Sequence, residues 1–118
     1  MIEQLKKKFS YAYQGIVHGI KVDTSIRMQC SFALLAIIVS LVLRFTVEEF
    51  AIVLGFCALI LGLEFTNSSI ERIMNLEEPE ISRSVKHIKD MSAAAVLVAS
   101  FFALVVGLMF VCRHLFGG

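Results

Sequence analysis

Three long stretches of the sequence contain no Asp, Glu, Lys, Arg or His, and they limit the possible folds more than any other feature. They cover residues 28–43, 50–63 and 91–112. About 20 residues of α-helix cross the ~30 Å hydrocarbon core of a membrane, so each stretch can span it once tolerant flanks are included. A chain of 118 residues with 58% hydrophobic content has too little polar surface to enclose three such helices in water. The sequence therefore predicts an all-α integral membrane protein with three transmembrane helices.

An amphipathic helix is expected before the first span. Its apolar positions recur at helical spacing, and they are Leu5, Phe9, Ala12, Tyr13, Ile16 and Ile20. Such a segment should lie along the membrane surface without crossing it. Gly15 and Gly19 within it permit a close helix contact or a bend, and simple flexibility is an equally good explanation. The pattern predicts one domain over 1–118, with a surface helix at about 3–22, spans at about 27–45, 49–72 and 90–113, and a cytoplasmic loop at about 73–89.

Basic residues are distributed unevenly between the two ends of the spans. Apart from Arg44 and Arg113, every lysine and arginine lies before or at the start of the first span, or from the end of the second span to the start of the third. By the positive-inside rule, the amino terminus and the 73–89 loop are cytoplasmic, and the carboxyl terminus is outside. Pro79 suits a first helical turn, and an apolar stripe starts at Ile81. The third spanning helix is therefore expected to begin before the membrane.

Polar side chains interrupt the second span in its cytoplasmic half. Helical periodicity places Glu64, Asn67, Glu71 and Asn75 on one face. An ionisable residue at membrane depth costs about 2.5–3.5 kcal/mol on insertion scales, so this face should meet a partner or a wet cavity. A functional role is favoured for Glu64. For Asn67, a hydrogen bond to a neighbouring helix is an equally good explanation, and Glu71 gains weight from its spacing to Glu64.

The oxygen ligands of this stripe suit a hard cation such as Mg²⁺, which takes one or two carboxylates together with substrate phosphates. The sequence contains neither of the common Gly-rich phosphate loops. A nucleotide would therefore have to be held by side chains from several helices. Lys89, beside Asp90, supplies a cation near the same interface, although by itself it would be interpreted as a lysine reaching toward water.

Two segments resemble the signature of the prokaryotic diacylglycerol kinase family. They are LEFTNSSIER, residues 63–72, and IKDMSAAAVLVA, residues 88–99. The family pattern is Glu-x-x-Asn-x-Ala-Ile-Glu, followed by Ala-Lys-Asp-x-x-(Ser/Ala)-(Ala/Gly)-Ala-Val. Nearly the whole chain is similar. The segment FSYAYQGIVHGIK, residues 9–21, looks closer to the Gram-positive branch, which is associated with undecaprenol kinase activity.

The resemblance implies a homotrimer of three-span subunits in the bacterial inner membrane. Such a protein transfers the γ-phosphoryl group of ATP to a lipid alcohol at the cytoplasmic face. By motif, Glu64 would be the general base and Glu71 a Mg²⁺ ligand. The residues that would position ATP and its phosphates are Asn67, Lys89 and Asp90.

Three positions depart from the family pattern. Asp23 matches a metal-ligating glutamate that precedes the first span, but its side chain is one methylene shorter. Asn75 stands where an aspartate is usual, and Ser69 replaces a common alanine. These departures leave room for an altered lipid preference or for a poorly active homologue.

The expected function is ATP- and Mg²⁺-dependent phosphorylation of undecaprenol to undecaprenyl phosphate. Conversion of diacylglycerol to phosphatidic acid is the first alternative, and a non-catalytic membrane homologue is the second. A small multidrug-type exporter would also use a membrane glutamate, but it would normally need four spans. A non-catalytic adaptor would not need Glu64, Asn67 and Glu71 together. No nucleic-acid partner is expected.

Overall fold

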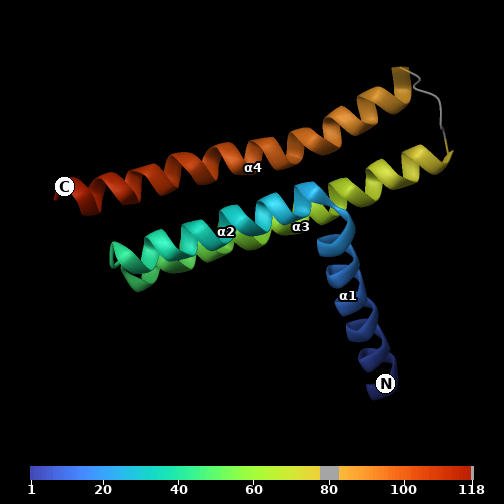
Figure 1. The fold of residues 1–118 in the computed structure, drawn as a ribbon, viewed down its shortest axis with the longest axis horizontal. Helices are drawn as coiled ribbons and strands as arrows, with labels where there is room; N and C mark the ends of the chain where they lie inside the picture. The colour runs from blue at the N-terminus through green and yellow to red at the C-terminus, as the bar shows by residue number, and fades with distance from the viewer. Residues whose placement is uncertain (78–82, 118) are drawn as a thin grey trace.

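Four α-helices make up the part of the chain that the computed structural model describes, residues 1–77 and 83–117. They are α1 (Ile2–Val22), α2 (Thr24–Val42), α3 (Val47–Glu77) and α4 (Arg83–Phe116). The helices α2, α3 and α4 run side by side, whereas α1 leaves the start of α2 at a steep angle (Figure 1). Each of α2, α3 and α4 is long and apolar enough to cross a membrane. The predicted all-α fold with three spanning helices is confirmed.

The central helix is α3, because both α2 and α4 pack against it. It continues to Glu77, and α4 begins at Arg83, so both helices extend into the range 73–89 that separates the predicted spans. Pro79 and Ile81, which suggested an early start for the last helix, lie outside the described residues. Antiparallel α3 and α4 therefore form a seam longer than a membrane span.

The face of α4 that meets α3 repeats with alternating steps of four and three residues. Val85, Val96 and Ala99 are buried on it, and Lys89, Ser92 and Ala103 are half-buried at the intervening positions. This spacing is that of a left-handed helix pair, in which one stripe of side chains stays turned toward the partner. Lys89 consequently belongs to the seam, unlike a lysine on the outer surface.

Asp23 joins α1 to α2. It follows the last turn of α1 and is the N-cap of α2, where its Oδ1 accepts a hydrogen bond from the Ile26 N–H at 3.2 Å. The guanidinium of Arg27 donates to the backbone carbonyls of Ile20 and Lys21, both at 2.9 Å. These bonds satisfy backbone groups that helix ends leave unpaired. The bend between the two helices is therefore held by side chains on either side of it.

Of the two glycines in α1, Gly19 is the one that lies close against α3. It is buried, and a Cβ built on it would lie 2.5 Å from Cε1 of Phe65. A Cβ on Gly15 would meet nothing within 4 Å. Of the explanations considered for these glycines, close contact therefore applies to Gly19.

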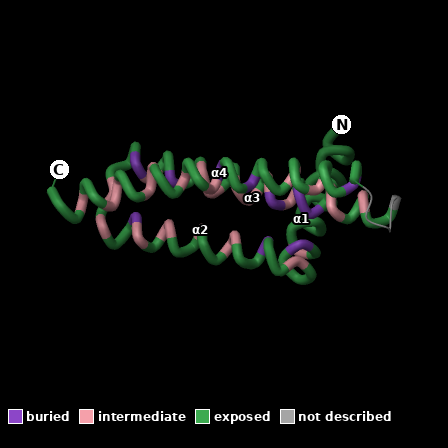
Figure 2. The backbone as a smooth tube through the Cα atoms, turned by 90° about the horizontal axis from the view of Figure 1, so that it is seen from above, coloured by how far each residue is buried: buried purple, intermediate pink, exposed green. Residues whose placement is uncertain are grey.

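The outward faces of the helices remain uncovered in a single chain. Most of the backbone is exposed, and the buried positions form short stretches where the helices meet (Figure 2). Large apolar side chains such as Phe32, Leu97 and Phe101 are more than half exposed. In water this surface would be strongly unfavourable, whereas lipid tails or other membrane helices can cover it.

Candidate functional site

The carboxyl-terminal half of α3 buries polar side chains inside the helix bundle. Glu64 is 5% exposed, and Asn67 and Ser68 are each 7% exposed. Glu71 is half-buried, and its Oε1 accepts a hydrogen bond from Nδ2 of Asn67 at 3.5 Å. The periodicity that placed Glu64, Asn67 and Glu71 on one face is therefore reproduced. Buried polar groups of this kind need partners.

One atom of this cluster has no such partner. Oδ1 of Asn67 is buried and accepts no hydrogen bond from the described part of the chain. Buried amide oxygens are nearly always paired, so an orphaned acceptor needs an explanation. A donor or a cation supplied from outside the described residues would satisfy it.

Asp23 brings a third carboxylate to the same region. The carboxylates of Asp23 and Glu71 both interact electrostatically with that of Glu64. Partial burial raises the pKa of Asp23, but hydrogen bonds from the Ser68 hydroxyl and from backbone N–H groups, together with the Arg72 charge, lower it further than burial raises it. The net pKa lies below the ordinary value, so Asp23 is ionised at neutral pH.

A pocket of about 290 Å³ lies beside Asp23, between α1 and α3. Its polar lining consists of His18, Asp23, Ser68, Ser69 and Arg72. A larger groove of about 610 Å³ separates α2 from α4 over α3, and its lining is almost wholly apolar. The smaller pocket therefore places polar groups at the junction with the surface helix, and the larger groove offers apolar contact only.

The donor set fits a metal that arrives with phosphates better than a metal held by protein alone. Among the described residues, no three His, Cys, Asp or Glu side chains are grouped closely enough to hold an ion. Mg²⁺ usually keeps several waters and takes only one or two carboxylates, with substrate phosphates completing its shell. The carboxylates of Asp23 and Glu71 and the unpaired Asn67 oxygen are donors of the required type.

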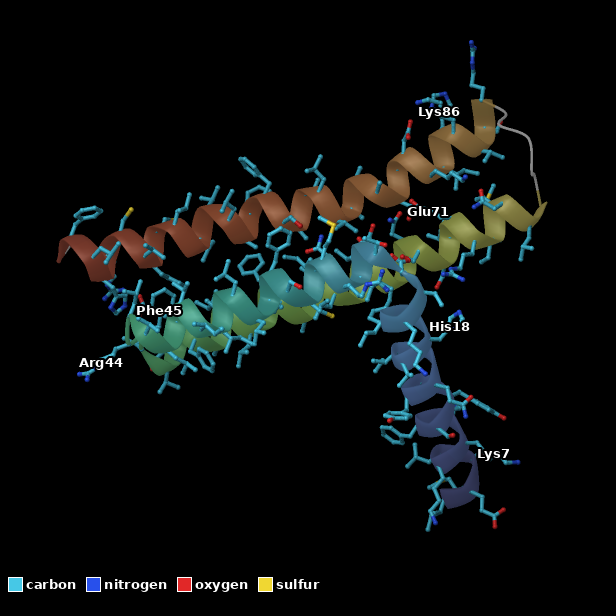
Figure 3. All side chains as sticks on the ribbon, in the orientation of Figure 1. Lys7, His18, Arg44, Phe45, Glu71 and Lys86 are labelled. Carbon is cyan, nitrogen blue, oxygen red and sulfur yellow. The ribbon has the colours of Figure 1, made fainter. Side chains whose placement is uncertain are left out.

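The two residues expected from α4 differ in their surroundings. Nζ of Lys89 donates across the seam to Oδ1 of Asn75 on α3. Asp90 instead accepts from Nζ of Lys86 at 2.7 Å, and both side chains of that pair are more than half exposed. Glu71 lies between α3 and α4, whereas Lys86 lies on the side of α4 turned away from α3 (Figure 3). Lys89 therefore lies on the side of α4 that meets Asn75 and Glu71 of α3. Asp90 is paired with Lys86 away from that side.

A second polar cluster lies at the opposite end of the same two helices. Glu49 is 3% exposed, and its Oε1 lies 2.7 Å from Nε2 of His114 near the end of α4. The Thr46 N–H donates to Oε1 of Glu49 at 2.8 Å, and the Glu49 N–H donates to Oγ1 of Thr46 at 3.1 Å. The Phe45 ring stacks on the His114 ring, with centroids 4.9 Å apart. We call Thr46, Glu49 and His114 the outer cluster.

Sequence reasoning missed this cluster and two residues beside Asp23. The Thr-x-x-Glu pattern at Thr46 is a capping-box signal and could have identified the start of α3. No local signal links Glu49 to His114, which is 65 positions away. Ser68 and Arg72 were likewise not singled out, because their proximity to Asp23 depends on how α1 and α3 meet.

Comparison with known families agrees with the geometry. The sequence matches the model of the family described as prokaryotic diacylglycerol kinase over residues 10–111. The matched range runs from α1 to near the end of α4 and includes every residue predicted for the site. No curated protein matches the chain.

Proposed function

Since the chain belongs to the prokaryotic diacylglycerol kinase family and is therefore a membrane lipid kinase, we propose that its preferred acceptor is undecaprenol. Kinase chemistry makes ATP the co-substrate, together with a divalent metal, for which we propose Mg²⁺. The observation that carries phosphoryl transfer to a lipid hydroxyl, whichever lipid is preferred, is Glu64, a carboxylate that is 5% exposed within a helix able to span the membrane. Diacylglycerol is the alternative acceptor.

Glu64 is proposed as the general base. The acceptor hydroxyl stays with its lipid at the membrane interface, whereas ATP arrives from water, so the two meet only where a polar group lies at membrane depth. Glu64 would take the hydroxyl proton as the lipid oxygen bonds to the γ-phosphorus and the bond to the bridging oxygen breaks, which releases ADP. Its burial against Asn67 and Ser68 holds the carboxylate inside the bundle.

The nucleotide is proposed to bind beside Glu64 at the inner end of the seam. Glu71 and Asp23 would hold the metal, with Asn67 as a further contact. When bound, Mg²⁺ neutralises phosphate charge that would otherwise repel the attacking oxygen. Lys89 would add a protein cation for the same phosphates. Asp90 would contribute only after its pair with Lys86 opens.

The lipid preference rests on the amino-terminal segment. Residues 9–21 resemble the branch associated with undecaprenol kinase activity, and α1 leaves apolar side chains such as Phe9 and Ile16 exposed. We propose that a single branched chain lies against this surface while its hydroxyl reaches the Glu64 carboxylate. A two-chain glycerol is bulkier, but each methylene is worth only ~1–3 kcal/mol in discrimination. Some diacylglycerol turnover is therefore expected.

A homotrimer in the bacterial inner membrane is proposed as the active form. The uncovered faces of α2 and α4 and the small number of metal donors in one chain both support sites completed by a neighbouring subunit. The end of the bundle with Glu71 and Lys89 is proposed to face the cytoplasm, since most basic residues lie there. The outer cluster would then face outside.

A phosphorylation assay tests the proposed acceptor. Purified protein in matched detergent receives ATP, Mg²⁺ and either undecaprenol or diacylglycerol, and kcat/KM is measured for each lipid. The Glu64→Gln variant provides the background rate. We expect the higher kcat/KM for undecaprenol. A clearly higher kcat/KM for diacylglycerol would reverse the proposed preference, and failure with both lipids in a protein that forms trimers would contradict both acceptors.

A further inference from the structure

Lys89 is the cation that the α3–α4 seam holds at its inner end. It lies on the stripe of α4 that contains buried Val85 and Val96, and it is half-buried itself. A lysine side chain has a flexible four-carbon stem, so its position alone does not determine where the ammonium group lies. A partner across the seam is needed to fix that group.

Asn75 is that partner. Its Oδ1 accepts the hydrogen bond from Nζ of Lys89, and the bond joins α3 to α4 across the residues that connect them. Of the acidic side chains that the structure describes nearby, Glu71, one turn earlier on α3, accepts from Asn67, and Asp90 accepts from Lys86. Asn75 is therefore the acceptor that directs Lys89 toward the face of α3 that carries Glu64 and Glu71.

We infer that Asn75 is a positioning residue for ATP, acting through Lys89. This inference rests on the proposed function, in which Lys89 contacts the nucleotide phosphates. An amide oxygen holds the ammonium without cancelling its charge, so the full positive charge remains available to phosphate. Asn75 therefore keeps an acceptor oxygen at the position where an aspartate is usual.

The inference makes a specific kinetic prediction for Asn75→Leu, which keeps a similar size but removes the acceptor. We expect the KM for ATP to rise roughly threefold to tenfold, with kcat within about twofold of wild type, because the lost hydrogen bond involves a charged group. Binding of a non-hydrolysable ATP analogue should weaken by the same factor. Asn75→Asp should restore most of the affinity, because it retains the acceptor oxygen.

Two controls separate positioning from a general effect on the fold. Ser84→Leu introduces the same side chain at an exposed position near the start of α4, and it should leave the KM for ATP unchanged. Asn75→Ala removes the same acceptor with a smaller side chain. It should raise the KM for ATP as Asn75→Leu does, and it replaces Asn75→Leu as the test if the leucine side chain disturbs folding. In a Lys89→Met background, Asn75→Leu should have no further effect.

The outcomes distinguish this inference from the proposed function. If Lys89→Met binds the ATP analogue normally, the phosphate role of Lys89 fails, and the inference fails with it. If Lys89→Met is defective but the Asn75→Leu and Asn75→Ala variants match wild type, the inference alone is overturned. An equal effect of Asn75→Leu with and without Lys89 would also overturn it, because Asn75 would then act by another route.

Discussion

The two ends of the α3–α4 seam both bury a glutamate, but they surround it differently. At one end, Oε1 of Glu49 receives bonds from the Thr46 N–H and from His114, and Arg113 approaches Oε2 at 3.5 Å. At the other end, Glu64 lies among other carboxylates, and the amide oxygen of neighbouring Asn67 has no partner among the described residues. The first glutamate is surrounded by donors and the second mainly by acceptors.

We interpret this difference as that between a structural cluster and the proposed functional site. Oε1 of Glu49 is hydrogen-bonded to Thr46 and His114, and Oε2 has the Arg113 charge beside it but no hydrogen bond from the described residues. This carboxylate therefore has cationic and N–H partners from both α4 and the start of α3, and it stabilises the contact between α3 and α4. Carboxylates that face one another are unfavourable until a cation or a proton donor arrives, so they suit a site that binds one. Mutations at the two ends should therefore have opposite effects on activity and stability.

The largest expected effect comes from Glu64→Gln. This change keeps the shape of the side chain but removes the proposed base, so we expect turnover to fall roughly 10²- to 10⁴-fold. Thermal stability in detergent should be retained. Glu48→Gln, an exposed acid at the other end of α3, is the matched control. Near wild-type turnover in Glu64→Gln would show that Glu64 is not the general base.

The second-largest expected effect is on the Mg²⁺ concentration that activity requires. Removing a proposed ligand in Glu71→Ala should raise the Mg²⁺ concentration for half-maximal activity by roughly tenfold or more. Asp23→Glu should be tolerated, whereas Asp23→Ala should raise the requirement as well. A titration of activity against Mg²⁺ at fixed ATP measures this. An unchanged requirement in Asp23→Ala would remove Asp23 from the metal site.

The contact of α1 with the inner end can be tested with a matched pair of glycines. Gly19→Ala places a Cβ 2.5 Å from Phe65, so it should destabilise the fold by about 1–3 kcal/mol through overpacking. Gly15→Ala meets open space and should be neutral or slightly stabilising, because alanine favours helix. Thermal unfolding in detergent compares them. Equal midpoints for the two variants would mean that α1 does not pack tightly here.

The smallest change in activity is expected from the outer cluster. Glu49→Ala removes the acceptor of His114 and of the Thr46 N–H at the start of α3, so the thermal midpoint should fall while kcat and the KM for ATP stay near wild type. His114→Ala should act similarly, and the double variant should be less unstable than the sum of the two, because the residues share one interaction. A large loss of kcat with normal stability would contradict the division between the two ends.

Several features of the fold follow from local sequence alone. Runs of apolar residues long enough to cross a membrane predict spanning helices, because backbone groups in lipid must be hydrogen-bonded within the segment. Helical periodicity places Glu64, Asn67 and Glu71 on one face, since their spacing determines their direction around the helix. The family motif adds the candidate roles of these residues, which remain predictions.

Contacts between helices were decided by the tertiary structure. Lys89 meets Asn75, and Glu49 reaches His114, through the crossing and register of α3 and α4. A one-residue change of register would turn each side chain by about 100°, and the local sequence does not specify the register of a distant partner. Spacing within one helix therefore determined which residues share a face, while packing between helices determined which of them meet.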